Sequence, residues 1–200
     1  MPDQSRPYRM TRRADSQAET RRRITESAVK LHGSLGPSRT SVSAVAADAG
    51  VRRSTLYRHF PDEAALFDAC TAHWAAANPP PDLAAWSTID DPEARLTAGL
   101  GEIYAFYRQT EAMLENLFRD EGAVPIVRER FAAFRAYFAA AQDALVAGRQ
   151  LRGAAKLRTR AAVGHAIAFS TWRSLVREQG LDDAAAADLM SALVAAAAQR

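Results

Sequence analysis

The 200-residue sequence contains a single cysteine, Cys70. One cysteine excludes an intrachain disulfide framework and a multi-cysteine zinc site, and it suits a reducing cytoplasm. No uninterrupted apolar stretch is long enough to cross a bilayer, and the polar, arginine-rich first residues lack the apolar segment of a signal peptide. We therefore expect a soluble cytoplasmic protein with no membrane partner, no metal and no cofactor.

The sequence also lacks the short motifs of common enzymes. It contains no His-Glu-x-x-His run, no phosphate-cradling glycine loop and no Gly-x-Ser-x-Gly elbow. The four histidines and the acidic residues could form a site in principle, but their spacing matches none of these patterns. We therefore expect no enzymatic activity and no catalytic residue, and a turnover assay on a broad substrate panel tests this alternative.

No segment of any length shows the alternation of a β-strand, and nothing repeats at the period of a solenoid. Apolar residues instead recur at helical spacing along most of the chain, and the hydrophobic content of 48% is enough for a packed interior. We predict an all-α fold of about nine helices, in which an N-terminal three-helix helix-turn-helix domain precedes a helical bundle.

Prolines and glycines divide the chain. Gly36-Pro37 ends a first helix, Gly50 turns between two short helices, and Pro61 begins a fourth helix. The run of prolines at 79–81 cannot continue a helix. The predicted organisation is a flexible basic arm over 1–15, a DNA-binding domain over 16–77, a proline-rich linker over 78–91 and a ligand-binding and dimerisation domain over 92–200.

Charge is unevenly distributed along the chain. Residues 1–60 carry 12 of the 26 basic residues but only 5 of the 23 acidic ones, so this part is +7 and the remainder is −4. A basic head on a mildly acidic body suits a protein that neutralises phosphates at one end. The alternative is that the arginine-rich start of the chain only aids solubility.

The two short helices around Gly50 follow the plan of a helix-turn-helix, whose second helix enters the major groove of DNA. Between the apolar Val51 and Leu56 lie four polar residues that can reach base edges or phosphates. The residues expected at the DNA interface are Thr40, Ser41, Ser43, Arg52, Arg53, Ser54, Thr55, Tyr57, Arg58 and His59.

The segments 40–51 (TSVSAVAADAGV) and 54–60 (STLYRHF) resemble the TetR (tetracycline repressor) family of one-component regulators. The resemblance covers about residues 17–70. It implies a homodimer that binds double-stranded operator DNA through the third helix, and a C-terminal domain of about five helices whose small-molecule effector releases the DNA. It implies phosphate-backbone contacts for Tyr57 and His59, a DNA-facing place for Thr40 and Ser43, and a hinge-packing role for Phe60.

Two positions depart from the family pattern. Arg52 stands where a serine usually caps the recognition helix, so a side-chain cap should be missing there. Glu63 stands where the family commonly has a lysine at the start of the fourth helix. An acid suits that end of a helix but repels phosphate, so we expect one phosphate contact to be lost.

Aromatic residues are concentrated after the linker. Most of them are expected to fill the core, but large side chains with polar tips can also line a ligand pocket. The ligand-binding candidates are Tyr107, Tyr137, His165 and Trp172. The last helix is rich in alanine and leucine, and it is either buried within the chain or paired with a second copy in a four-helix interface. The interface candidates are Phe169, Leu175, Leu189 and Leu193.

A ligand carrier or protein-interaction protein with a vestigial helix-turn-helix is the alternative function. The basic head and Arg52 and Arg53 argue against it, and the absence of DNA binding at low salt would support it. From the assigned roles, loss of Tyr57 or His59 should weaken binding to all sequences, whereas changes at Arg53 or Thr55 should alter which sequence is preferred.

Overall fold

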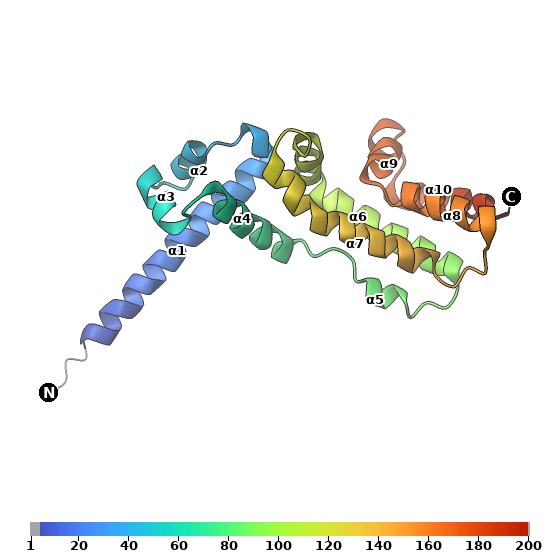
Figure 1. The fold of residues 1–200 in the computed structure, drawn as a ribbon, viewed down its shortest axis with the longest axis horizontal. Helices are drawn as coiled ribbons and strands as arrows, with labels where there is room; N and C mark the ends of the chain where they lie inside the picture. Colours follow the sequence, from blue (N-terminus) through green and yellow to red (C-terminus); the bar gives the residue numbers. More distant parts are fainter. Residues whose placement is uncertain (1–4, 200) are drawn as a thin grey trace. The chain divides into compact units, whose positions relative to one another are not determined.

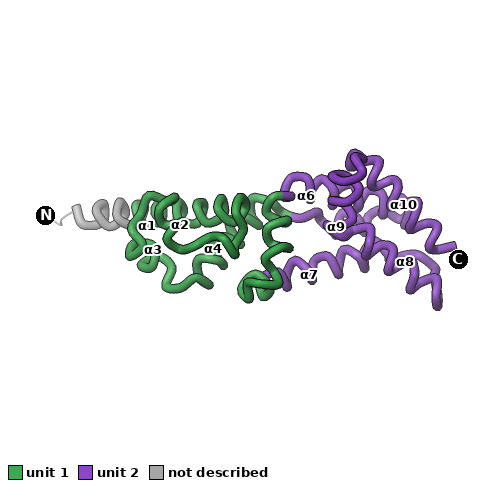
Figure 2. The backbone as a smooth tube through the Cα atoms, turned by 90° about the horizontal axis from the view of Figure 1, so that it is seen from above, with its two compact units in different colours: residues 1–79, 112–129 green, residues 80–111, 130–200 purple. Residues whose placement is uncertain are grey.

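A computed structural model describes residues 5–199 of the chain, with side chains from residue 14 onward (Figure 1). Within this part the fold is all-α: ten α-helices and no strand, which confirms the predicted fold class. The helices group into two compact units (Figure 2). Unit 1 contains the residues up to 79 and residues 112–129, and unit 2 contains residues 80–111 and those from 130 onward.

Unit 1 is built around its first helix, against which the next three helices pack. Its elements are α1 (Ser5–Ser34), the 3-10 turn η1 (Pro37–Arg39), α2 (Val42–Asp48), α3 (Arg53–His59), α4 (Glu63–Ala77), and the adjoining ends of two long helices, α6 (Pro92–Asp120) and α7 (Pro125–Val146). Its core contains Ile24, Ala28, Val45, Leu56 and Phe60, each at most 1% exposed. The apolar residues that recur at helical spacing in the sequence therefore form the core of unit 1.

The first helix begins earlier than the sequence suggested. A flexible arm was expected over 1–15, but α1 already starts at Ser5, and only residues 1–4 lie outside the described residues. Pro7 falls in the first turn, where the missing N–H has no helical partner to lose. Between Pro7 and Gly33 the sequence contains no glycine or proline, so nothing interrupts the helix over this stretch.

Residues 112–129 lie with unit 1, whereas the sequence assigned all of 92–200 to one C-terminal domain. The Asn116 amide donates to the carbonyl oxygens of His32 (3.1 Å) and Gly33 (2.8 Å) at the end of α1. The buried Asp120 carboxylate accepts the Ser38 N–H at 2.9 Å. These bonds satisfy backbone groups that a helix end and a turn leave without partners, and no pattern in the sequence announces them.

Unit 2 contains the remaining helices. Its elements are α5 (Leu83–Trp86), α6 up to Glu111, α7 from Arg130 onward, α8 (Gly153–Ala166), α9 (Phe169–Arg173), the π-helical turn η2 (Ser174–Glu178) and α10 (Asp183–Gln199). Helix α8 packs against α10. The short α5 falls within the expected linker, where Trp86 is buried and donates its indole N–H to Glu102 at 2.9 Å.

The sequence from about 155 to 179 predicts a single helix that Gly180 ends, but the chain breaks between α8 and α9. Ala168 is extended (φ −73°, ψ 136°), so the carbonyls of Ala166 and Ile167 have no helical partner further along the chain. The hydroxyls of Tyr104 and Tyr107, one turn apart on α6, donate to these two oxygens at 2.8 and 2.6 Å. Buried tyrosines therefore stabilise a break that periodicity alone does not reveal.

Candidate nucleic-acid interface

The turn between α2 and α3 depends on Gly50, whose φ of 64° lies in the left-handed region. The Gly50 N–H donates to the Ala47 carbonyl at 3.1 Å, and the Val51 N–H donates to the Ala46 carbonyl at 2.9 Å. These two bonds form a Schellman motif, which ends α2 sharply and turns the chain into α3. The turn predicted from the sequence is present, with glycine at the position that requires it.

The residues before α2 have local structural roles. The Ser41 hydroxyl caps α2 by accepting the Ala44 N–H at 3.1 Å, and the half-buried Thr40 donates its hydroxyl to the Gly36 carbonyl at 2.8 Å. Both were expected at the DNA interface, and these bonds occupy their hydroxyls in the free protein. Ser43 is exposed in the first turn of α2.

Helix α3 buries one side and exposes the other. Leu56 is 1% exposed, whereas Arg52, Arg53, Ser54 and Arg58 are exposed on the surface of unit 1. Arg52 forms no side-chain cap at the start of α3, as its residue type suggested. Three further candidates are half-buried: Thr55, Tyr57 and His59. The structure therefore brings the expected recognition residues together on and beside one short helix.

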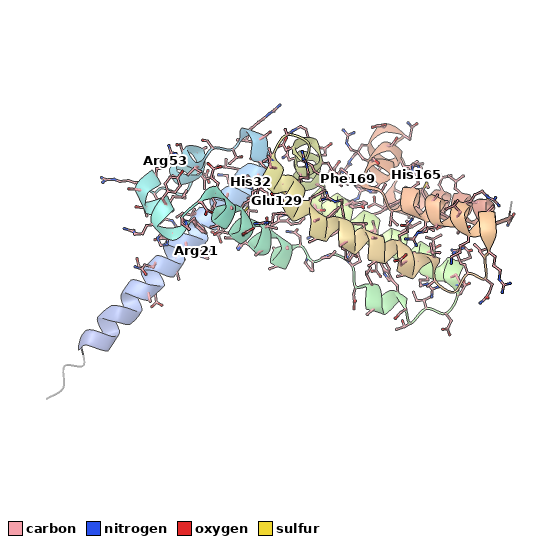
Figure 3. The ribbon with its side chains drawn as sticks, viewed as in Figure 1. Arg21, His32, Arg53, Glu129, His165 and Phe169 are labelled. Carbon is pink, nitrogen blue, oxygen red and sulfur yellow. The ribbon has the colours of Figure 1, made fainter. Side chains whose placement is uncertain are left out.

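Arg53 lies on α3 (Figure 3). Its side chain contacts that of Tyr57. The guanidinium carbon of Arg53 lies 5.4 Å from the centroid of the Tyr57 ring, and Nη2 of Arg53 donates to the Tyr57 hydroxyl at 3.2 Å. Spacing of four residues on a helix makes this contact possible. The sequence predicted different roles for these two residues, but their side chains are bonded to each other.

Two arginines of α1 bond carbonyls at the C-terminal ends of α2 and α3. Arg21 donates to the His59 carbonyl at 2.6 Å and lies 4.1 Å above the Phe60 ring, and Arg23 donates to the Ala49 carbonyl at 2.7 Å. Carbonyls at the end of a helix lack intrahelical donors and carry partial negative charge, so guanidinium groups suit them. No sequence pattern reveals these roles, because the partners are main-chain atoms distant in sequence.

The intervening Arg22 has a different environment. It lies on the exposed side of α1 and bonds Glu19 at 2.8 Å and Glu26 at 2.6 Å. Two carboxylates neutralise its charge locally, so Arg22 adds little positive potential to unit 1.

The charges around α3 are mostly positive. Arg52 and Arg58 form no ion pair within the described part of the chain. Partial burial lowers the pKa of His59, and the positive charges of Arg58 and Arg21 lower it further. His59 therefore resists protonation and can act as a neutral donor or acceptor. The opposing acids are at the start of α4, where Asp62 caps the helix by accepting the Ala65 N–H at 2.7 Å and Glu63 is exposed in the first turn.

The ligand-binding candidates all lie in unit 2 but differ in how deeply they are buried. Tyr107 and Trp172 are buried with their rings 5.8 Å apart, and the Trp172 indole donates to Asp183 at 2.9 Å. Tyr137 is half-buried and donates to the Pro81 carbonyl at 2.8 Å. His165 is exposed and lies 3.4 Å from the Thr171 hydroxyl. All four polar groups thus have hydrogen-bond partners within unit 2.

The interface candidates divide in the same way. Phe169 is 7% exposed and packs at 5.2 Å from the Tyr107 ring, so it belongs to the core of unit 2. Leu175 is half-buried in η2. Leu189 and Leu193, one turn apart on α10, are 41% and 51% exposed.

Comparison with known proteins gives one family match and several similar folds. The family model of bacterial regulatory proteins, tetR family, matches residues 24–70, which span α1 to α4. A comparison with curated proteins gave no significant match. No helix in the described part of the chain is both long enough and apolar enough to span a membrane.

Three solved structures have a similar fold over most of their length. A Clostridium perfringens protein named as a fatty acid metabolism regulator has a TM-score of 0.63 at 17% identity, covering 86% of this chain and 96% of that one. A protein from Mesorhizobium loti described as a TetR-family transcriptional regulator has a TM-score of 0.59 at 16% identity, covering 90% and 96%. A TetR transcription regulator from Haloarcula marismortui has a TM-score of 0.58 at 13% identity, covering 91% and 97%.

Proposed function

We propose that this chain, a member of the TetR family of bacterial transcriptional regulators, is a cytoplasmic repressor that binds a palindromic operator as a homodimer. A small molecule bound by unit 2 releases it from the DNA. No catalytic role is assigned to any residue.

The arrangement of α2 and α3 is the observation that carries DNA binding. The Schellman turn at Gly50 fixes α3 after α2, and Arg23 and Arg21 bond carbonyls at the C-terminal ends of α2 and α3. The outer side of α3 then presents Arg53, Ser54 and Arg58 without an acid among them. A short polar helix braced by a second helix is the element that enters a major groove.

The exposed leucines support a dimer of unit 2. Leu189 and Leu193 on α10 and Leu157 on α8, which is 71% exposed, lie on the two helices that pack together. The neighbouring exposed positions on these helices are largely alanine: Ala154 and Ala161 on α8, and Ala185, Ala192 and Ala196 on α10. Small and apolar side chains allow two such pairs of helices to meet closely as a four-helix interface.

Ligand response is placed at the α8–α9 break. The Tyr107 hydroxyl is already bonded to Ile167, and its ring contacts those of Phe138, Phe169 and Trp172 at 5.2 to 5.8 Å. A ligand that accepts a hydrogen bond from the Tyr107 hydroxyl must compete with the Ile167 carbonyl for that bond. Binding therefore shifts the population between two arrangements of the break, and an apolar molecule with one acceptor is the chemistry that fits.

Selection of duplexes from a randomised library by the purified full chain tests the function. We expect an inverted repeat to be enriched, with half-site centres about one helical turn or roughly 34 Å apart, and two protomers bound per duplex. The triple variant Arg52→Gln, Arg53→Gln, Arg58→Gln removes the three charges but keeps good helix formers in α3. It is the control and should enrich nothing. Failure of the wild-type chain to enrich any duplex at low salt contradicts the proposal and favours the carrier alternative.

A further inference from the structure

We propose that Arg53 reads a guanine in each half-site of the operator and that Tyr57 positions its guanidinium for this contact. The inference rests on the proposed function, because it names the base recognised by the helix-turn-helix. It goes beyond that function by assigning one base to one side chain.

The geometry around Arg53 carries the inference (Figure 3). Its guanidinium lies over the Tyr57 ring, 5.4 Å from the centroid, and donates one N–H to the phenolic oxygen at 3.2 Å. Tyr57 is itself half-buried and packs against the core cluster of unit 1. A fixed aromatic ring therefore holds the end of an otherwise flexible side chain.

Ordering before binding favours readout of a base over contact with a phosphate. Immobilising a long side chain at an interface is unfavourable, and Arg53 has lost part of that freedom already in the free protein. A phosphate can be reached from many directions, so it needs no such orientation. Arg52 and Arg58, on either side of Arg53 in sequence, are exposed and form no ion pair with any described residue, so they suit that less demanding role.

The remaining donors of Arg53 match guanine among the four bases. A guanidinium has five N–H groups, and the bond to Tyr57 uses one of them. A planar fork of two donors remains. Guanine presents two acceptors side by side in the major groove, O6 and N7, whereas adenine places a donor beside its acceptor. Bidentate recognition by arginine follows from this match.

The local charges leave the fork available. No carboxylate forms an ion pair with Arg53 in the described part of the chain, where its guanidinium donates to the Tyr57 hydroxyl. Glu63, exposed at the start of α4, acts on the charge of Arg53 from a distance and raises its pKa slightly after the larger effect of Tyr57. The guanidinium is therefore charged, ordered and not occupied by an acid.

The test starts from the duplex that the full wild-type chain selects. We expect one position of each half-site to be guanine, and selection with Arg53→Gln or Arg53→Ala to lose that preference while other positions stay the same. Replacing this guanine by 7-deazaguanine removes N7 but keeps base pairing. Wild-type affinity should fall about 10-fold, and that of Arg53→Ala should fall less than about 2-fold.

Two further variants separate readout from charge. Arg53→Lys keeps the positive charge but lacks the fork, so the guanine preference should weaken while the dependence of affinity on salt stays unchanged. Tyr57→Phe keeps the ring and removes the hydroxyl, and should reduce discrimination against 7-deazaguanine. Arg52→Ala is the matched control and should lower affinity for all duplexes alike, with a smaller salt slope.

The outcomes distinguish this inference from the proposed function. If Arg53→Ala weakens binding to all sequences equally and lowers the salt slope, Arg53 contacts a phosphate and the inference is wrong, while DNA binding stands. The inference is also wrong, and DNA binding still stands, if no position of the selected site shows a guanine preference that is lost in Arg53→Ala. If the wild-type chain selects no duplex, the proposed function itself fails.

Discussion

Glu63 is the residue whose charge most directly opposes DNA binding. It is exposed in the first turn of α4, beside the capping Asp62. Glu63→Lys should therefore raise affinity for the operator and steepen the dependence of log affinity on log salt by about 0.9 for each phosphate newly contacted. Fluorescence anisotropy at several salt concentrations measures both quantities.

Asp90→Lys is the matched control for that substitution, because Asp90 is exposed in unit 2 and the change in net charge is the same. Equal gains for the two variants would show that net charge alone sets affinity, and that the start of α4 makes no phosphate contact.

His32 links the stability of unit 1 to pH. It is 8% exposed, its ring lies 5.3 Å from that of Phe67, and Nδ1 is 3.4 Å from the Cys70 sulfur. Burial lowers the pKa of His32 to about 4, against the smaller opposite effect of Asp120. The unfolded chain binds the proton more readily, near its usual pKa of about 6.5. Stability contributed by the neutral ring is therefore present above that pH and is lost as pH falls towards 4.

Between pH 7 and pH 5 this effect should reduce the free energy of opening of unit 1 by about 2 kcal/mol. Native-state hydrogen exchange of the α1 amides at both pH values measures it. The phenylalanine of the His32→Phe variant does not titrate, so the free energy of opening of this variant should fall by about 2 kcal/mol less over the same pH range. Identical losses in both proteins would assign the pH dependence to other groups.

Cys70 illustrates a residue whose role follows from burial. Burial raises the pKa of its thiol to about 12, and it donates to the Phe67 carbonyl at 3.2 Å. The neutral thiol is a poor nucleophile, so Cys70 is a packing residue of α4. The sequence excluded a disulfide framework correctly, but it could not place this side chain beside His32, which is 38 residues away.

The α1 arginines determine how firmly α2 and α3 are held. Arg21→Met keeps most of the aliphatic side chain but removes the bond to the His59 carbonyl, so it should destabilise α3 by about 1 kcal/mol. Exchange of the α3 amides should accelerate accordingly, and operator affinity should fall without a large change in salt slope. These effects identify Arg21 as a positioning residue.

Arg22→Met provides the comparison, because Arg22 bonds only exposed glutamates on the outer side of α1. Loss of such a surface pair should change stability by less than about 0.5 kcal/mol and leave α3 exchange unchanged. If Arg21→Met and Arg22→Met behave alike, Arg21 does not hold α3.

Helices and turns were predictable from the sequence where the signal is local. Ser41 and Gly50 mark the boundaries of α2 and α3 because each acts on its own neighbours in the chain. Pro61 was expected in the first turn of the fourth helix, but α4 begins two residues later, at Glu63 behind the Asp62 cap. The break between α8 and α9 was missed because its stabilising groups, Tyr104 and Tyr107, come from α6. The sequence alone does not distinguish a tyrosine that bonds a ligand from one that bonds a main-chain carbonyl.

The candidate site follows the same division. The polar side of α3 could be read from residue types between buried positions, and the structure gathers those residues on one element. The Arg53–Tyr57 contact fits a spacing of four, yet the sequence analysis gave the two residues separate roles. Arg21 and Arg23 could not be assigned, because three successive arginines on a helix look equivalent until their partners are known.

Assembly of the whole molecule depends on the exposed leucines of α10. The double variant Leu189→Glu, Leu193→Glu places charges on this surface, so a dimer formed through it should dissociate to monomers. Loss of bivalent binding should then lower affinity for a full palindrome by about 100-fold or more, with little effect on a single half-site. Light scattering coupled to size exclusion gives the oligomeric state.

Leu35→Glu is the control for that variant, because Leu35 is 43% exposed at the end of α1 in unit 1. It should leave the oligomeric state unchanged. A double variant that is still dimeric would show that α10 is not the interface.

The most direct measurement is sedimentation of the full chain with its selected duplex across a salt series. We predict a complex of two protomers per palindromic duplex, whose log affinity falls linearly with log salt by about 0.9 for each phosphate contacted, and which Arg52→Ala weakens. A chain that is monomeric and does not sediment with any duplex at low salt would contradict the assignment of α3 as a recognition helix.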